Sequence, residues 1–121
     1  MNNNSLSRFE LKGRVIVITG GAGLLGVMHA ESIAGAGGTP ILVDLNGESA
    51  EKSATYISKK FSVSALGVKT DITNKTDVEI LYNTVFKKFG RIDGLINNAA
   101  NNPQMERSQK KRSGADSKTF P

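Results

Sequence analysis

Short runs of β-branched and other apolar residues alternate along this chain with stretches whose apolar residues recur at helical spacing. The apolar runs predict strands over residues 14–19, 39–45, 65–70 and 93–97. Between them, the helical spacing predicts helices over residues 24–36, 48–61 and 75–89. Such alternation is typical of a parallel sheet with right-handed crossovers. We therefore expect an α/β fold whose four strands lie in the order 3-2-1-4.

The apolar stripe of each predicted helix indicates which side lies against the sheet. In the first helix this stripe consists mainly of small residues, which suits close packing. In the third helix the expected inward positions are Val78, Leu81, Tyr82, Val85 and Phe89.

A glycine-rich turn, Gly20-Gly21-Ala22-Gly23-Leu24-Leu25-Gly26, joins the first strand to the first helix. A strand, a glycine turn and a helix in this order can hold the pyrophosphate of a dinucleotide. Gly20 allows a sharp turn, and Gly23 lets N–H groups approach phosphate oxygens without a Cβ between them. Gly26 lets the helix pack closely on the strand. A tight turn without a ligand is the alternative interpretation of these glycines.

The second strand ends at Asp44, eighteen positions after Gly26. An acidic residue at about this distance is placed to accept hydrogen bonds from an adenosine ribose. The same carboxylate would repel the 2′-phosphate of NADP, and the following Leu45, Asn46 and Gly47 supply no positive charge. NAD is therefore the expected cofactor, with NADP disfavoured, unless Asp44 is an ordinary turn residue.

The composition excludes several classes of site. The chain of 121 residues allows one small domain, and its 38% hydrophobic content is adequate for a core. Without cysteine there are no disulfides or thiolate metal ligands, and with a single histidine, His29, we expect no metal site. Neither a secretory signal nor a membrane-spanning apolar run is visible, so we expect a cytoplasmic protein without a membrane partner.

The positive charge of the chain is concentrated near its end. Residues 104–121 contain five basic and two acidic side chains, which account for +3 of the net +5. A nucleic-acid-binding module that uses Lys110-Lys111-Arg112 is one alternative function. No aromatic residue interleaves these three for base stacking, so we expect a solvated loop instead.

Three separated segments, residues 19–26, Asp71-Ile72 and Asn97-Asn98-Ala99-Ala100, resemble the short-chain dehydrogenase/reductase family. The resemblance runs from about residue 11 to residue 103 and implies a Rossmann-type fold that binds NAD(P). It implies that the glycine turn holds the pyrophosphate, that Asp71 and Ile72 flank the adenine, and that Asn97 and Ala99 lie along the cofactor and brace the central sheet. The expected cofactor-binding residues are Gly20, Gly21, Ala22, Gly23, Leu24, Leu25, Gly26, Asp44, Leu45, Asp71, Ile72, Asn97, Asn98 and Ala99.

The glycine spacing departs from the commonest pattern of this family, T-G-x-x-x-G-x-G, which would have a glycine at Leu24. The middle glycine here is Gly23, a spacing similar to that of nucleotide-sugar epimerases and dehydratases. The segment Asn97-Asn98-Ala99-Ala100 is more similar to the oxidoreductase subfamily. Two functions stay open, the cofactor half of an alcohol/carbonyl oxidoreductase and that of an epimerase or dehydratase. A non-catalytic nucleotide-binding module is a third.

The resemblance also implies a catalytic serine, tyrosine and lysine on and after a fifth strand, and this chain contains no such segment. Tyr56 and Lys60 have the Y-x-x-x-K spacing, but they lie in the second predicted helix, where we expect a solvated surface. We therefore expect no catalytic residue here and no activity of this chain alone. The sequence reads as one truncated after the fourth strand. A longer version of the chain would also bind a small-molecule substrate and could form a homo-oligomer.

The chain divides into three predicted parts. Residues 1–12 form an N-terminal arm, residues 13–103 form the NAD(P)-binding half-domain, and residues 104–121 form a basic loop or disordered tail.

Overall fold

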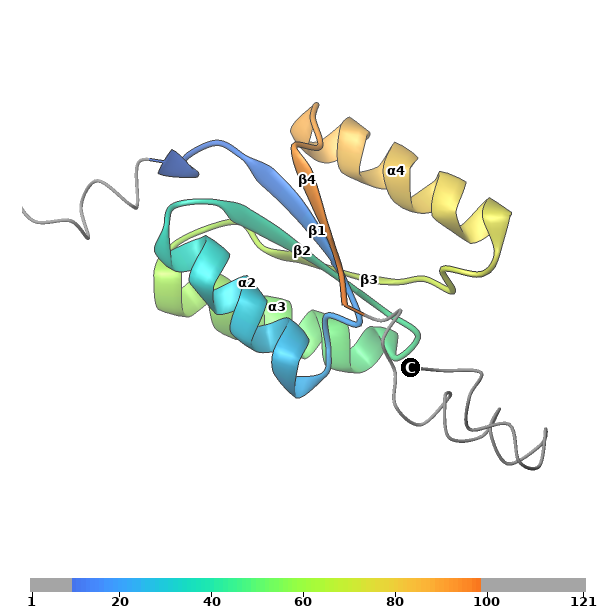
Figure 1. Cartoon of the computed structure of the whole chain (residues 1–121), viewed down its shortest axis with the longest axis horizontal. Helices are drawn as coiled ribbons and strands as arrows, with labels where there is room; N and C mark the ends of the chain where they lie inside the picture. Colours follow the sequence, from blue (N-terminus) through green and yellow to red (C-terminus); the bar gives the residue numbers. More distant parts are fainter. Residues whose placement is uncertain (1–9, 99–121) are drawn as a thin grey trace, which may run out of the picture.

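A computed structural model describes residues 10–98 of the chain (Figure 1). Most of the predicted N-terminal arm and the whole predicted basic tail, with Lys110, Lys111 and Arg112, lie outside the described residues. The predicted site residue Ala99 also lies outside them.

Four parallel strands and three long helices alternate along the described chain. The elements are β1 (Val15–Thr19), α2 (Leu24–Gly35), β2 (Thr39–Asp44), α3 (Gly47–Phe61), β3 (Leu66–Lys69), α4 (Lys75–Phe89) and β4 (Gly94–Asn97). The strand order is β3-β2-β1-β4, and each neighbouring pair is parallel. Helices α2 and α3 cover one face of the sheet and α4 covers the other (Figure 1). The predicted Rossmann-type architecture and its strand order are confirmed.

The two central strands are buried on both faces, which explains why they are continuous apolar runs. In β1, Ile18 packs toward α2 and α3, whereas Val17 packs toward α4. The same alternation in β2 sends Leu42 and Ile41 to opposite faces, and all four side chains are at most 1% exposed. The buried residues of helix α2 are mainly small, as predicted: Gly26, Ala30 and Ala34, together with the larger Ile33.

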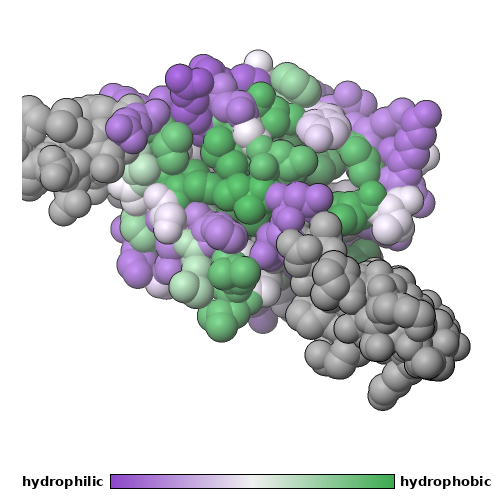
Figure 2. Space-filling view, in the orientation of Figure 1, coloured by the Kyte–Doolittle hydropathy of each residue, from purple (hydrophilic) through white to green (hydrophobic). Residues whose placement is uncertain are grey.

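Helix α4 buries less of its apolar surface than the sequence predicts. Leu81 and Val85 are buried against β1 and β2, but Tyr82 is 37% exposed and its predicted burial is wrong. The nearby Phe86 is also exposed, and Leu95 on the edge strand β4 is 55% exposed. Figure 2 shows hydrophobic surface across the middle of the face that carries β4. This side of the sheet therefore has fewer covering side chains than the side packed by α2 and α3.

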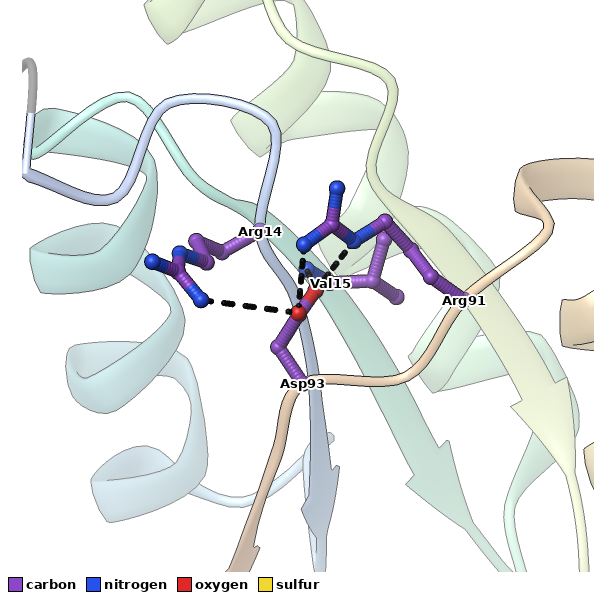
Figure 3. A network of polar contacts seen from close by, with 4 residues as sticks. All are labelled: Arg14, Val15, Arg91 and Asp93. Carbon is purple, nitrogen blue, oxygen red and sulfur yellow. Dashed lines mark hydrogen bonds and ion pairs between the residues drawn. The ribbon is translucent and has the colours of Figure 1, made fainter.

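A charged cluster joins β1 to β4 at the amino ends of these strands (Figure 3). The carboxylate of Asp93 accepts hydrogen bonds from the backbone N–H of Val15 at 2.8 Å and from the guanidinium of Arg91 at 2.7 and 2.8 Å. Arg14 lies 3.7 Å from the same carboxylate. The hydrogen bonds from Arg91 and from Val15 hold the pKa of Asp93 below its usual value. This cluster helps set the register of β4 beside β1.

Candidate cofactor site

The carboxyl ends of all four strands meet at one edge of the sheet, opposite the Asp93 cluster. Because the strands are parallel, Thr19 at the end of β1 lies beside Val43 of β2 and Asn97 of β4. Asp44 ends β2, and Asp71 follows β3. The fold thus brings together four predicted site segments that are far apart in the sequence. In open α/β sheets this edge is where ligands bind.

The glycine turn is shaped by close backbone contacts. Gly20 has a φ of +67°, a conformation that favours glycine. A Cβ on Gly21 would lie 2.7 Å from the Cα of Leu42, so the turn packs directly on β2. A Cβ on Gly26 would overlap the carbonyl oxygen of Gly20 and approach the Cα of Gly21 to 2.8 Å. Gly26 therefore allows α2 to start against the turn.

Gly23 differs from these glycines because the surrounding fold leaves room for a side chain. The nearest atom to a Cβ there would be the Gly20 carbonyl oxygen at 3.6 Å, an ordinary van der Waals distance. The packing of residues 10–98 therefore does not explain a glycine at this position. Close approach of a ligand to the backbone would explain it, and the residues present fit a bound pyrophosphate.

Helix α2 starts without a capping side chain, unlike the two other long helices. Its N-cap is Gly23, and its first turn contains no acidic residue. In α3 and α4 the side chains of Asn46 and Asn74 each accept a hydrogen bond from a first-turn N–H. The first N–H groups of any helix lack partners within the helix, and the helix dipole makes them attractive to anions. The start of α2 is thus open to a phosphate group.

The carboxylate of Asp44 points toward the glycine turn. Its Oδ2 accepts a hydrogen bond from the backbone N–H of Ala22 at 3.1 Å, and its Oδ1 accepts one from Asn46 at 3.0 Å. A carboxylate oxygen can accept two hydrogen bonds. Each oxygen therefore keeps capacity for a ribose hydroxyl, while the two backbone bonds hold the carboxylate in place. Leu45, the next predicted site residue, is exposed beside it.

Asp71 and Ile72 form the far end of this edge. The Oδ1 of Asp71 accepts hydrogen bonds from the backbone N–H and the hydroxyl of Thr73 at 2.9 and 2.6 Å. Both bonds hold the pKa of Asp71 below its usual value, and the bond from the Thr73 hydroxyl has the larger effect. Asp71 is therefore ionised at neutral pH. Ile72 is exposed, as an apolar surface for a flat ring would be.

Asn97 and Asn98 connect the end of β4 to β1 and to the turn. The hydroxyl of Thr19 donates to the Oδ1 of Asn97 at 3.1 Å. The side-chain amide of Asn98 donates to the carbonyl oxygen of Gly20 at 3.2 Å. Both contacts join residues 78 positions apart, and no sequence pattern predicts them.

Lys69 is a basic neighbour of the site that the sequence analysis missed. In the parallel pairing of β2 with β3, Lys69 lies opposite Asp44. Its Cβ also lies close to Gly47 at the start of α3, where an added Cβ would approach it to 2.7 Å. Only the register of the two strands reveals this position, because Lys69 is distant from Asp44 in the sequence.

Tyr56 and Lys60 lie on the outer surface of α3 and bond to α2. The Tyr56 hydroxyl donates to Glu31 at 3.0 Å and accepts from the Lys60 ammonium at 3.1 Å. Tyr56 and, more weakly, Glu31 raise the pKa of Lys60. Glu31 lies eight residues beyond Gly23, roughly 12 Å along α2 from the turn. Tyr56 is 48% exposed, so the predicted solvated surface is confirmed, and the pair also joins α3 to α2 at a distance from the strand ends.

Residues 10–98 lack the features of a membrane span and of a metal site. No helix there is long and apolar enough to cross a membrane. The same residues contain no group of three or more histidine, cysteine, aspartate or glutamate side chains that could hold a metal ion.

Comparison with known proteins identifies the family of the chain. The short chain dehydrogenase family matches residues 14–118. A relative from Yarrowia lipolytica, described as a probable NADP-dependent mannitol dehydrogenase, is 36% identical over 99 residues. That match covers 82% of this chain and 35% of the relative.

Solved structures of two enzymes share the fold. An NAD⁺-bound xylitol dehydrogenase is 31% identical with a TM-score of 0.67, over 71% of this chain and 33% of that one. An NADPH-dependent 3-quinuclidinone reductase from Rhodotorula rubra is 33% identical with a TM-score of 0.68, over 78% of this chain and 36% of that one. The chain therefore spans about a third of the length of each of these three proteins. It belongs to the short chain dehydrogenase family.

Proposed function

We propose that this chain is the cofactor-binding part of an NAD-dependent oxidoreductase that interconverts an alcohol and a carbonyl compound. The observation that carries the proposal is the uncapped start of α2 at Gly23, beside the carboxylate of Asp44. The partial positive charge at the start of α2 suits a pyrophosphate, and the neighbouring carboxylate suits a ribose diol. The names of the relatives, which are dehydrogenases and reductases of alcohols and ketones, support the reaction class.

In this proposal each group at the strand ends has its own part of the cofactor. The first turn of α2, with Leu24 and Leu25, takes the pyrophosphate, and Asp44 with Leu45 takes the adenosine ribose. Asp71 and Ile72 flank the adenine, while Asn97 and Asn98 lie along the cofactor. When bound, NAD supplies the hydride acceptor. The residues of this chain bind and orient it.

Asp44 favours NAD over NADP by charge. At an effective dielectric constant of about 20, two like unit charges roughly 4 Å apart repel by about 4 kcal/mol, and solvent screening lowers this to about 1–3 kcal/mol. That range corresponds to a roughly five- to hundred-fold preference for NAD. Lys69 lies opposite Asp44 and offsets part of this repulsion. We therefore propose a preference for NAD toward the lower end of the range.

In this proposal the chain has no catalytic site of its own. The proton-transferring tyrosine and its lysine belong to a part of the family's sequence that this chain does not contain. Tyr56 and Lys60 do not replace them, since the Tyr56 hydroxyl is bonded to Glu31 on the outer side of the helices. We expect NAD binding without turnover.

A calorimetric or NMR titration of the purified chain with NAD tests the binding, and an absorbance assay of cofactor reduction tests turnover. We expect saturable NAD binding and no reduction of the cofactor with any alcohol. Absence of NAD binding would contradict the proposed function. If the parent chain reduced the cofactor and Tyr56→Phe did not, Tyr56 and Lys60 of α3 would be catalytic.

An NAD-binding half of a nucleotide-sugar epimerase or dehydratase is the second candidate, because the middle glycine is Gly23 and position 24 is a leucine. The DNA downstream of the Pro121 codon discriminates the two. A continuation that encodes a long substrate domain would favour this candidate over a simple alcohol oxidoreductase.

A further inference from the structure

One peptide group of the glycine turn, the one between Gly20 and Gly21, is held from both neighbouring strands. Its N–H, on Gly21, donates to the carbonyl oxygen of Val43 in β2 at 2.9 Å. Its carbonyl, on Gly20, accepts a hydrogen bond from the side-chain amide of Asn98, just after β4, at 3.2 Å. The plane of this peptide is thus fixed across the end of β1.

The Gly20 carbonyl oxygen is enclosed as well as bonded. It accepts a second hydrogen bond from the N–H of Gly23 at 3.2 Å, which uses the second lone pair of the oxygen. Gly26 lies so close to it that no side chain fits between them. The oxygen is therefore enclosed against Gly23 and Gly26, the N-cap and the first turn of α2, with both lone pairs used.

This orientation matters for an anion. A carbonyl oxygen directed at a phosphate would repel it, whereas N–H groups attract it. Glycine permits the peptide to rotate easily, because it tolerates both signs of φ, and Gly20 has a φ of +67°. Among the bonds to this peptide that the structure describes, Asn98 provides the one made by a side chain.

We propose that Asn98 is a positioning residue for cofactor binding. It holds the Gly20 carbonyl enclosed, so that the first turn of α2 presents its N–H groups to the pyrophosphate without a carbonyl oxygen beside them. The inference rests on the proposed function, because it concerns the same cofactor site. It differs from a direct contact of Asn98 with the cofactor, since the side-chain amide is bonded to the turn. Asn98 therefore acts on the pyrophosphate through Gly20 and contributes nothing to adenosine recognition.

The test is an NMR titration of the whole chain and its Asn98→Ala variant with NAD, ADP and adenosine. Asn98→Ala removes the amide without adding a charge near the phosphates. We expect the Kd values for NAD and ADP to rise on the order of tenfold, as expected when a hydrogen bond that holds a partly buried group is lost. The Kd for adenosine, which has no phosphate, should change by less than about twofold. Asn83→Ala, at an exposed position on α4, is the matched control and should leave all three unchanged.

Each other outcome contradicts this role of Asn98. An equal loss of affinity for all three ligands would mean that Asn98 only maintains the fold. Weaker binding of NAD alone would mean a direct contact with the nicotinamide half, and unchanged binding would mean no role. If Asn98→Ala does not fold, Asn98→Ser, whose side chain is too short to reach Gly20, is measured in its place. If the parent chain does not bind NAD, both the proposed function and this inference are wrong. If the parent binds NAD but Asn98→Ala does not give the expected pattern of Kd values, only the role of Asn98 is wrong.

Discussion

The carboxylate of Asp44 and the backbone N–H of Ala22 are joined by a hydrogen bond of 3.1 Å. The group proposed to recognise the ribose thus also holds the turn proposed to bind the pyrophosphate. The two residues are 22 positions apart in the sequence, at the end of one strand and in the turn after its neighbour. Substitution of Asp44 is therefore expected to change more than one part of cofactor recognition.

Asp44→Ser should lower the affinity for NAD and reduce the NAD preference. The substitution removes both the acceptors for the ribose hydroxyls and the charge that repels a 2′-phosphate. We expect the preference of the parent, toward the lower end of the roughly five- to hundred-fold range, to fall to about threefold or less. The measurement is the pair of Kd values for NAD and NADP, before and after substitution. Equal affinities in the parent, or an unchanged ratio in the variant, would show that Asp44 does not recognise the ribose.

Lys69→Ala should weaken NADP binding and leave NAD binding nearly unchanged. An exposed lysine beside Asp44 attracts the extra phosphate of NADP, and such exposed charge interactions have energies of about 0.2–1 kcal/mol. We expect a loss of about threefold in NADP affinity. Lys59→Ala, on α3, provides a control for the general loss of one positive charge. The same loss for NAD and NADP would contradict a role of Lys69 in cofactor choice.

Gly26→Ala and Gly23→Ala should separate folding from ligand binding. The new methyl group at position 26 would overlap the Gly20 carbonyl oxygen, so we expect a loss of about 3 kcal/mol or more in the free energy of unfolding. At position 23 the methyl group fits the fold, and the loss should stay within about 1 kcal/mol. NAD affinity should nevertheless fall in Gly23→Ala. Urea unfolding measures the change in stability, and NAD titration measures the change in affinity. If Gly23→Ala binds NAD as tightly as the parent, the proposed close approach of the pyrophosphate to the backbone at Gly23 is wrong.

Asp93→Asn should lower the melting temperature at neutral pH. Its depressed pKa means that the folded state favours the ionised form, so the carboxylate stabilises the fold above its ordinary pKa of 3.8. This contribution is lost as the pH falls through the lowered folded-state pKa. We expect a Tm difference of roughly 5 °C at pH 7 that narrows below pH 3.8.

Thermal unfolding of the parent, of Asp93→Asn and of the exposed α4 variant Glu79→Gln at several pH values checks this prediction. If the Tm difference between the parent and Asp93→Asn is the same at pH 7 and below pH 3.8, the charge of Asp93 does not contribute to stability.

The sequence determined the order and the limits of the secondary structure. Every strand and long helix begins and ends within one residue of its predicted position. The reason is physical, because strands buried on both faces must be continuous apolar runs and helix ends need special residues. Gly37 and Gly90, for example, adopt the positive φ values that end α2 and α4. The glycine turn and Asp44 could also be identified from the sequence. The turn is a run of consecutive residues, and Asp44 ends a strand at a characteristic distance after it.

Only the tertiary structure decided which groups touch one another at the strand ends. The bonds from Asn98 to Gly20 and from Asp44 to Ala22, and the position of Lys69 opposite Asp44, depend on strand order and register. The exposure of Tyr82 likewise depends on what packs beside α4. Periodicity describes one element at a time, whereas these contacts join residues from different elements. Their energies arise only when the sheet has assembled.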